Sequence, residues 1–546
     1  MLTRALPLAV LVIAAVAAFA VYEAGAPGRA QRHLLETYAA DWGHGDFHRM
    51  YTMLSADSRR RITEAEFRSK LEDDADIATV TSLRPGRLIS TSGHEARLRF
   101  VVETRTFGAL DEVLQLPFVG SGGGTRIRFA PKILFPGLRS DEKLRRTALL
   151  GPRGTLLAAD GTPLAKGPSR STPIPSVASA IVGTLGPIPA DQRAAYAAQG
   201  YPVKAQVGQD GLELIFQKQL AGRPGGRLMA GHRLLAARTP TPGHTVRTTI
   251  VPRLEQAAIA AIGTSYAGMT VLSRSGGIEA AAGIAFTDVQ PPGSTMKIVT
   301  ATAALQAGIV KLTTEYPYQS SITLDGFKMQ NAAGETCGGS LLNAFATSCD
   351  TVFAPVGAQL GAKRLVHMAE RFGFDEPTGI PTAVESTIPS VKTIGDALAV
   401  GASAIGQGRV QASTLELADV AATIADGGRR PLPRIRAGQR PRYVRVTTPE
   451  VAHEVQQMME AVVSFGTGTT AQIPGVTVAG KTGTAELGST VNQANNKQLT
   501  DSWFVGYVPH GSAKLVAAAL FPSAGYGADV AAPAVRLVLE SALGLS

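Results

Sequence analysis

One feature near the start of this chain constrains its possible architecture more than any other, an uncharged apolar run from Ala5 to Val21. The run is about long enough to cross a bilayer, which takes roughly 17 to 25 residues. Arg4 is the single positive charge before it, so the positive-inside rule puts the short N-terminal tail in the cytoplasm. We therefore expect a single-pass anchor in the plasma membrane over residues 1–26, with the bulk of the chain extracytoplasmic. Ala24-Gly25-Ala26 resembles a signal-peptidase site, so a cleaved signal peptide is the competing interpretation.

The composition of the remaining chain is that of a globular protein with several domains. Its 546 residues exceed the ~250 to 300 that one hydrophobic core supports. The net charge of +10 comes from scattered basic residues, so we interpret it as a general surface property and expect no nucleic-acid partner. Two cysteines are too few for a disulfide scaffold or a four-cysteine zinc site. His44 and His48 lack a third ligand, so we predict surface histidines and no metal.

Two regions without a catalytic pattern follow the apolar run. The first, from Ala30 to about Ala130, is typical of helices packed on a curved antiparallel sheet, and Thr63 and Glu66 have the spacing of a capping box. One strand is predicted because apolar residues alternate with charged ones, namely Ala96, Leu98, Phe100 and Val102 with Arg97, Arg99 and Glu103. In the second region, Asp160-Gly161 predicts a tight turn between two short strands.

The C-terminal block of some 300 residues contains a serine and a lysine suited to nucleophilic catalysis. Ser294 to Ala307 has helix-forming composition and ends at Gly308, so Ser294 and Lys297 lie on one face of a predicted helix. A serine hydroxyl needs a base to take its proton, and a lysine whose pKa is lowered by its surroundings can act as that base. A lone Ser-x-x-Lys is usually only a solvated helix face, so further elements are needed.

Two such elements follow in the chain. Lys481-Thr482-Gly483-Thr484 lies within Val476 to Ala485, a predicted strand that could bind a carboxylate. Ser348-Cys349-Asp350, on a predicted loop between helices, supplies a second hydroxyl. In this order, Ser-x-x-Lys, Ser-x-polar and Lys-Thr-Gly match the signature of the serine acyltransferases that react with penicillins.

On these motifs the whole chain resembles a class B penicillin-binding protein of the branch with an NTF2-like first domain. Further matches lie at Tyr38 to Phe47, Phe135 to Leu138, Gly406 to Gly408, Asp426 to Gly428, Gly466 to Gly468 and Trp503 to Tyr507. The resemblance implies a multidomain α+β fold. Its expected parts are the anchor 1–26, an NTF2-like domain 27–138, a dimerisation or pedestal domain 139–240, and a transpeptidase domain 241–546 with an antiparallel sheet and helices.

The resemblance also implies a peptidoglycan D,D-transpeptidase that needs no metal or organic cofactor. Ser294 would attack the bond between the terminal D-alanines of a stem peptide, with Lys297 as base and Ser348 and Lys481 in proton transfer. The backbone N–H groups of Ser294 and Thr484 would form the oxyanion hole, and Thr482, Gly483 and Thr484 would bind the substrate, its carboxylate being held by the two threonine hydroxyls. β-Lactams would acylate Ser294. The implied partners are a SEDS-family glycosyltransferase and other envelope-synthesis proteins.

Two features depart from the family pattern or add to it. Asp350, a substrate-binding candidate, stands where the family usually has asparagine; an ionised carboxylate only accepts hydrogen bonds and could raise the pKa of Lys297 and Lys481. Cys337 and Cys349 are the only cysteines, and an extracytoplasmic location would permit a disulfide between them, with two buried thiols as the alternative.

Two other classes of function remain open from the sequence. A β-lactamase or β-lactam sensor shares the serine chemistry, although we find no glutamate assignable to deacylation. A catalytically weak envelope scaffold would keep the fold while tolerating an altered motif, and Asp350 is the feature in its favour.

Overall fold

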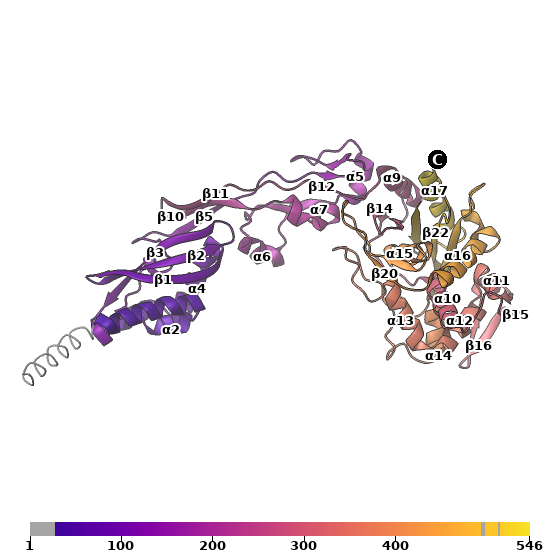
Figure 1. Ribbon diagram of the computed structural model, residues 1–546, viewed down its shortest axis with the longest axis horizontal. Helices are drawn as coiled ribbons and strands as arrows, with labels where there is room; N and C mark the ends of the chain where they lie inside the picture. Colours follow the sequence, from indigo (N-terminus) through magenta and orange to yellow (C-terminus); the bar gives the residue numbers. More distant parts are fainter. Residues whose placement is uncertain (1–27, 493–496, 512–513, 546) are drawn as a thin grey trace, which may run out of the picture. The chain divides into compact units, whose positions relative to one another are not determined.

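The computed structural model describes residues 28–492, 497–511 and 514–545 (Figure 1). The expected anchor, with Ala5 to Val21, lies outside the described residues, and no helix within them is both long and apolar enough to span a bilayer. The chain divides into two compact units, of which the first holds residues up to 153 with 186–207 and 221–244. The second holds 154–185, 208–220 and the chain from 245 onward, so the expected pedestal segment contributes to both units.

The first unit packs helices on an antiparallel sheet. The chain is helical over 28–44, and then forms α2 (Phe47–Thr52), α3 (Ala56–Arg61) and α4 (Glu64–Ala78). The sheet has the order β1-β2-β3-β4, from β1 (Val80–Ser92), β2 (Glu95–Thr104), β3 (Gly108–Val119) and β4 (Arg126–Ile127). A second sheet of order β11-β10-β5 joins β5 (Leu144–Leu149), β10 (Gly225–Ala230) and β11 (Arg233–Arg238).

Local predictions for this unit are confirmed. Thr63 and Glu66 form a reciprocal capping box at the start of α4, because each side chain accepts a hydrogen bond from the other's backbone N–H. On β2 the apolar side chains of Ala96, Leu98 and Phe100 are buried, while the arginines between them are exposed. The alternation of apolar and charged residues along this strand therefore predicted correctly which of its two faces is buried.

The second unit is built on one antiparallel sheet of order β14-β13-β23-β22-β21. Its strands are β13 (Gly268–Ser273), β14 (Ile278–Gly283), β21 (Ala479–Asn492), β22 (Lys497–Tyr507) and β23 (Leu515–Phe521). Met269 to Leu272 and Ile278 to Ala282, which flank the turn at Ser273 to Gly277, lie in β13 and β14 and pair as a hairpin. Lys481 to Thr484 pair along β21 with Val505 to Ser502 of β22, so the Lys-Thr-Gly motif lies on the edge strand.

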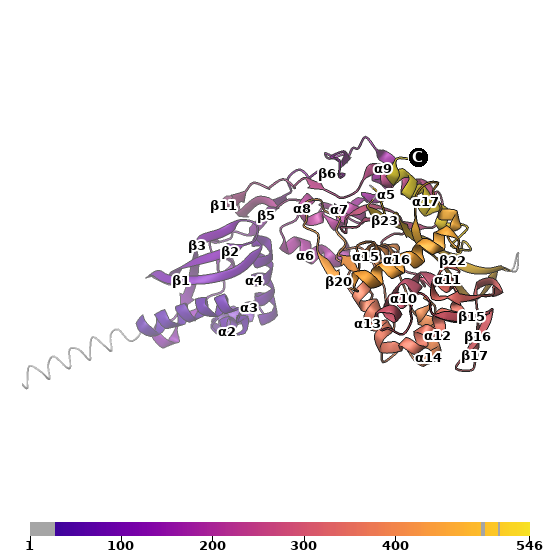
Figure 2. The same cartoon turned by 45° about the vertical axis from the view of Figure 1, so that its right-hand side comes forward.

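Helices cover both faces of this sheet (Figure 2). On one face, α9 (Pro252–Ile262) and α17 (Ala531–Leu543) pack against Phe504, Ala517 and Ala519. On the other, the larger core receives Trp503, Val505 and the remaining alternate residues. It is built from α10 (Lys297–Gln306), α11 (Leu341–Ala346), α12 (Asp350–Leu360), α13 (Ala362–Phe372), α14 (Ala397–Ala404), α15 (Thr414–Ala425) and α16 (Pro449–Ser464). Because both faces are covered, every residue of the central strand β23 is apolar and buried.

The structure also contains several short strands and helices. A small sheet of order β12-β6-β7 joins β6 (Leu156–Leu157), β7 (Pro163–Ala165) and β12 (Val246–Arg247), with the expected turn at Asp160-Gly161 between β6 and β7. The short ribbons of the second unit are β15 (Glu315–Gln319) with β18 (Cys337–Ser340), β16 (Ser321–Leu324) with β17 (Phe327–Gln330), and β19 (Arg429–Pro431) with β20 (Tyr443–Arg445). The remaining helices and strands are η1 (Gly122–Gly124), η2 (Pro131–Ile133), α5 (Pro175–Ile181), β8 (Leu185–Pro187), η3 (Ala190–Gln192), α6 (Arg193–Ala198), β9 (Gln206–Gly208), α7 (Gly211–Ile215), α8 (Gln217–Leu220), η4 (Gly293–Met296), η5 (Ala332–Gly334) and η6 (Thr469–Ala471).

Candidate active site

Ser294 lies in a tight 3₁₀ turn that leads into α10. The expected helix from Ser294 to Ala307 is therefore divided, with η4 holding the serine and α10 beginning at Lys297. The turn is crowded by backbone from two sides. The Gly293 N–H donates to the Gly406 carbonyl at 2.9 Å, and a Cβ on Gly293 would lie 2.6 Å from the Thr484 carbonyl oxygen. Gly293 also has a φ of +54°, so only glycine meets both demands without strain.

The side-chain nitrogen of Lys297 contacts Ser294, Ser348 and Asp350. Lys297 Nζ lies 3.0 Å from Ser294 Oγ, 3.3 Å from Ser348 Oγ and 2.7 Å from Asp350 Oδ1. It also donates to the Ser348 backbone carbonyl at 2.6 Å. The lysine is fully buried, and its Nζ is 5.7 Å from the centroid of the Phe353 ring. This geometry puts an amine within reach of the proton of both serine hydroxyls.

Lys481 approaches the same centre from the sheet. Its Nζ donates to Ser348 Oγ at 2.8 Å and to the Thr482 carbonyl at 3.1 Å. Ser348 Oγ therefore lies between the two lysine amines, one on α10 and one on β21. A hydroxyl between two amines is placed to relay a proton.

Burial controls the charge of both lysines. Removal from water lowers the pKa of Lys297 from its usual value, against the opposing effect of the Asp350 carboxylate. Burial also lowers the pKa of Lys481 well below its usual value, and the nearby charge of Lys297 lowers it further. Asp350 raises the pKa of Lys297, as expected from its charge, but desolvation is the larger effect and lowers it.

Ser348 sits at the turn between α11 and α12. Its φ of +59° is left-handed, and the N–H of Cys349 reaches back to the Ala344 carbonyl at 2.8 Å, which ends α11. Asp350 then begins α12, where a carboxylate is favoured by the helix dipole. One reversal of the chain thus presents Ser348 and Asp350 together toward Lys297.

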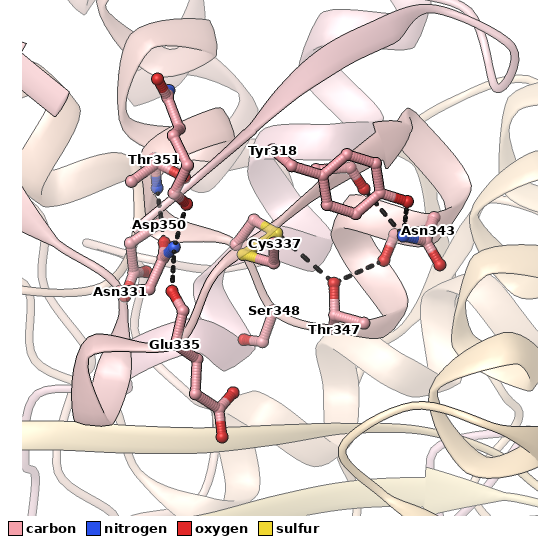
Figure 3. Close-up of a disulfide and its surroundings, with 12 residues drawn as sticks. Tyr318, Asn331, Glu335, Cys337, Asn343, Thr347, Ser348, Asp350 and Thr351 are labelled. Atoms are coloured by element: carbon pink, nitrogen blue, oxygen red, sulfur yellow. Dashed lines mark hydrogen bonds between the residues drawn. A yellow bond between two sulfur atoms is a disulfide. The ribbon is translucent and has the colours of Figure 1, made fainter. Parts of the chain in front are cut away.

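A disulfide and an asparagine hold this turn (Figure 3). Cys337, on β18, is bonded to Cys349, and their Cα atoms are 5.8 Å apart. The buried Asn331 accepts from the Thr351 N–H at 3.0 Å and donates to the carbonyls of Gln319 and Glu335 at 2.9 and 2.8 Å. Both links tie the segment before α11 to the first turn of α12.

Removal of this disulfide should lower stability. The bond closes a loop of 12 residues in sequence, for which the chain-entropy model gives ~3 kcal/mol. We expect Cys337→Ser with Cys349→Ser, or a reductant on the unaltered protein, to lower the midpoint of urea unfolding followed by tryptophan fluorescence. Because the chain has only these two cysteines, the reductant should have no effect on the double variant. An equal effect of reductant on both proteins would contradict the assignment.

Most of the candidate residues line one cleft of about 830 Å³, whereas Lys297 and Lys481 are buried behind it and are not part of its walls. Its walls include Ser294, Ser348, Asp350, Thr467, Thr482 and Thr484. The hydroxyl groups of Thr482 and Thr467 are 2.6 Å apart, and Thr484 Oγ1 accepts from the Gly527 N–H at 3.4 Å. Gly483 does not line the cleft; a Cβ there would meet the Pro292 carbonyl at 2.7 Å, so its role is to let β21 approach the nucleophile loop.

Sequence reasoning missed several residues that shape this site. Asn331 has no motif around it, and only its three backbone hydrogen bonds in the folded chain identify it. Thr467 and Trp503 were noted only as family landmarks, yet Thr467 contacts Thr482 and the Trp503 indole N–H donates to the Pro291 carbonyl at 2.9 Å. The glycines flanking Thr467 were the one signal that could have singled it out.

Three features define a serine acyltransferase of the penicillin-binding fold. They are a serine hydroxyl within hydrogen-bonding distance of a buried lysine, a second serine between two lysines, and a Lys-Thr-Gly motif on an edge strand. Family models agree with this class. Residues 264–540 match the penicillin-binding protein transpeptidase domain, 156–248 the penicillin-binding protein dimerisation domain, and 30–142 the NTF2-like N-terminal transpeptidase domain. The chain belongs to the penicillin-binding protein transpeptidase family, which confirms the resemblance seen in its sequence.

Among relatives, the peptidoglycan D,D-transpeptidase PbpA of Mycobacterium tuberculosis is 34% identical over 286 residues, which cover 47% of this chain and 56% of that protein. The peptidoglycan D,D-transpeptidase MrdA of Acinetobacter baumannii is 29% identical over 277 residues, covering 44% and 41%. The chain thus matches only about half the length of these relatives.

Solved structures match over more of the chain. The D,D-transpeptidase domain of a peptidoglycan glycosyltransferase from Eggerthella lenta aligns with a TM-score of 0.59 at 25% identity, covering 72% of this chain and 99% of that one. An imipenem acyl-enzyme complex of penicillin-binding protein A from M. tuberculosis aligns with a TM-score of 0.56, again at 25% identity and with the same coverage. These likenesses support a multidomain α+β architecture with a transpeptidase fold.

Proposed function

We propose that this protein is a serine-type peptidoglycan D,D-transpeptidase that β-lactams acylate. The proposal depends on one observation, the chain of hydrogen bonds that runs from Ser294 Oγ through the buried Lys297 to Ser348 Oγ and Lys481. The named activity of relatives such as PbpA supports it. The substrates are the stem peptides of peptidoglycan, and no metal or organic cofactor takes part.

Acylation begins with Ser294. Neutral Lys297, whose Nζ is 3.0 Å from Ser294 Oγ, takes the hydroxyl proton. Ser294 Oγ then attacks the carbonyl between the two terminal D-alanines. Backbone N–H groups of Ser294 and Thr484 hold the oxyanion, and loss of one such donor typically costs ~3 to 4 kcal/mol. The proton reaches the departing amine through Ser348, which Lys481 holds at 2.8 Å.

Transfer completes the cycle. The hydroxyls of Thr482 and Thr484 hold the carboxylate of the donor peptide on the cleft wall. D-alanine leaves, and an amino group of a second stem peptide attacks the acyl-enzyme and closes the cross-link. When a water molecule attacks the acyl-enzyme in place of the amine, the peptide leaves as a free acid and the Ser294 hydroxyl is restored, which is a carboxypeptidase side reaction.

The experiment that tests this function is intact-mass measurement of the protein with a penicillin over time. We expect a stable adduct of one drug mass, lost slowly, and absent from Ser294→Ala. Rapid loss of the adduct with turnover of the drug would instead indicate a β-lactamase. No adduct at any dose would favour the scaffold, and Asp350→Asn, which restores the usual family residue, would then be tested for regained acylation.

The acylation rate should rise with pH as Lys297 loses its proton. Asp350 is 2.7 Å from this amine, and its negative charge raises the pKa of Lys297 against the effect of burial. Asp350→Asn removes that charge, so the pKa of Lys297 falls further and the rising limb of the profile moves to lower pH. The check is the second-order rate constant for a fluorescent penicillin between pH 5 and 9 (roughly the range in which shifted lysines titrate). A shift to higher pH would contradict the assignment of Lys297 as base.

We propose that the chain keeps the domain division 27–138, 139–240 and 241–546, and that residues 1–26 anchor it in the plasma membrane. The partner proposed is a SEDS-family glycosyltransferase.

The apolar run Ala5 to Val21 supports the membrane anchor. Cell fractionation tests it, because the full chain should sediment with membranes at full mass and a chain beginning at residue 27 should not. A shortened mature protein in the soluble envelope fraction would identify a cleaved signal peptide.

A further inference from the structure

A second cavity of the second unit shares no lining residue with the catalytic cleft. It has a volume of about 560 Å³ and lies between α15, the loop after α13, the end of α7 and the chain of the β19–β20 ribbon. We call it the α15 cavity, after the helix that supplies Glu416 and Asp419 to its wall. Its volume is in the range of small-molecule sites, which is ~300 to 1,000 Å³.

At the α15 cavity, the buried carboxyl groups of Glu416 and Asp419 on its floor and the exposed one of Glu376 surround the guanidinium group of Arg430. Glu416, Asp419 and Arg430 are 7%, 4% and 5% exposed, so all three are more than nine-tenths buried. Arg430 Nη2 donates to Glu376 Oε2 at 2.5 Å, and Arg430 Nε is 3.9 Å from Asp419 Oδ2. One positive charge therefore faces three groups that can each become negative.

Polar atoms of this floor are left without partners. Among the described residues, Glu416 Oε1, Asp419 Oδ1 and Arg430 Nε have no hydrogen-bond partner. Burial raises the pKa of Glu416 to about 8 and that of Asp419 well above its usual value, so the two carboxyl groups resist becoming negative together. Buried acceptors without donors are costly, which favours a ligand that donates hydrogen bonds and carries positive charge.

The rim of the cavity has the opposite charge. Arg436, Arg440 and Arg442 line it and are exposed, and Arg434 lines it while bonded to Ser275. A simple cation would be repelled by these arginines, and a simple anion by the carboxylates below them. Within the described ranges no group of three or more His, Cys, Asp or Glu is arranged to hold a metal ion. The acidic floor and the basic rim together favour a ligand that carries both a positive and a negative charge.

We propose that the α15 cavity binds a small zwitterion, an amino acid or short peptide, whose ammonium group contacts Glu416 and Asp419 and whose carboxylate faces the rim arginines. An ammonium group has three N–H donors, enough for both unpartnered carboxylate oxygens. The carboxylate is matched by guanidinium groups, which bind it in pairs of parallel hydrogen bonds. This site does not depend on the function proposed for Ser294.

Isothermal titration of the full-length Ser294→Ala protein with diglycine tests the proposal, because this variant excludes turnover at the catalytic serine. We expect one site per chain with millimolar or tighter affinity. Glycylglycinamide lacks the carboxylate and N-acetyl-diglycine lacks the ammonium group, so each should bind about tenfold more weakly or worse.

Two variants with matched controls locate the site. Glu416→Gln should weaken diglycine about tenfold, whereas Glu255→Gln, at a buried carboxyl of α9 whose pKa is also raised, should leave binding unchanged. Arg440→Ala changes only an exposed rim residue and tests the carboxylate contact without risk to folding; Arg364→Ala, at an exposed arginine of α13, is its control.

Proton release gives an independent readout. Arg430, Glu376 and Asp419 face Glu416, and burial raises the pKa of Glu416 to about 8. An arriving ammonium favours the ionised carboxylate, so binding should release protons at pH 7 and tighten as the pH rises to 8. The proposal is overturned if diglycine shows no saturable binding, if the amide and acetyl analogues bind equally well, or if Glu416→Gln and Arg440→Ala leave the affinity unchanged.

Discussion

Replacement of Lys297 by methionine should slow acylation of Ser294 by a penicillin about 10²- to 10⁴-fold, the usual contribution of a general base. Methionine keeps most of the volume of this fully buried side chain but has no group to take the proton of Ser294 Oγ. The same change leaves the Asp350 carboxylate without its cation. Stopped-flow measurement with a fluorescent penicillin gives the second-order rate constant.

The control for this variant is Lys363→Met, at an exposed lysine of α13, which should acylate at the normal rate. Circular dichroism and the thermal midpoint separate loss of the base from loss of the fold. A folded Lys297→Met protein that acylates within a few-fold of the normal rate would remove Lys297 from the mechanism and leave Lys481 as the base to test.

Substitution of Gly483 by alanine should lower the acylation rate by about 10²-fold, because a displacement of ~1 Å near a reacting centre can cost that much. A Cβ at Gly483 would lie 2.7 Å from the Pro292 carbonyl oxygen and 2.9 Å from Trp503 Cβ. The nearest of these atoms is backbone, so β21 or the loop before Ser294 must move. That movement separates the backbone of Thr484 from the nucleophile turn.

The matched control is Gly123→Ala in the first unit, where a Cβ would meet nothing within 4 Å. The fluorescent-penicillin assay applied to both variants should slow only for Gly483→Ala. If Gly483→Ala retains the normal rate and stability, the contact between β21 and the nucleophile loop is not what aligns the site.

Local elements could be predicted where the pattern was short-range. The capping box of α4, the buried alternation of β2 and the β13–β14 hairpin depend on residues close in sequence, and all three are present. The start of α10 was less well predicted, because the 3₁₀ turn at Ser294 is imposed by Gly406 and Thr484, which are distant in the chain.

The residues of the candidate site likewise fall into those that a sequence motif identifies and those that only the folded structure identifies. The motifs identified four catalytic candidates, Ser294, Lys297, Ser348 and Lys481. In the structure their side chains form one continuous chain of hydrogen bonds, in that order. Asn331 was not found, because its contacts with Gln319, Glu335 and Thr351 leave no pattern in the sequence. The α15 cavity likewise joins Glu376 to Arg430 across separate elements.

The sequence by itself determined the chemical groups of this protein, the order of its motifs and its family, because side-chain chemistry and local periodicity are written residue by residue. The tertiary structure alone decided the balance at Lys297, where complete burial outweighs the charge of Asp350 and lowers the pKa. It also decided which backbone segments enclose Ser294. Desolvation and close approach are properties of the packed chain, since they depend on neighbours that folding brings together from distant positions.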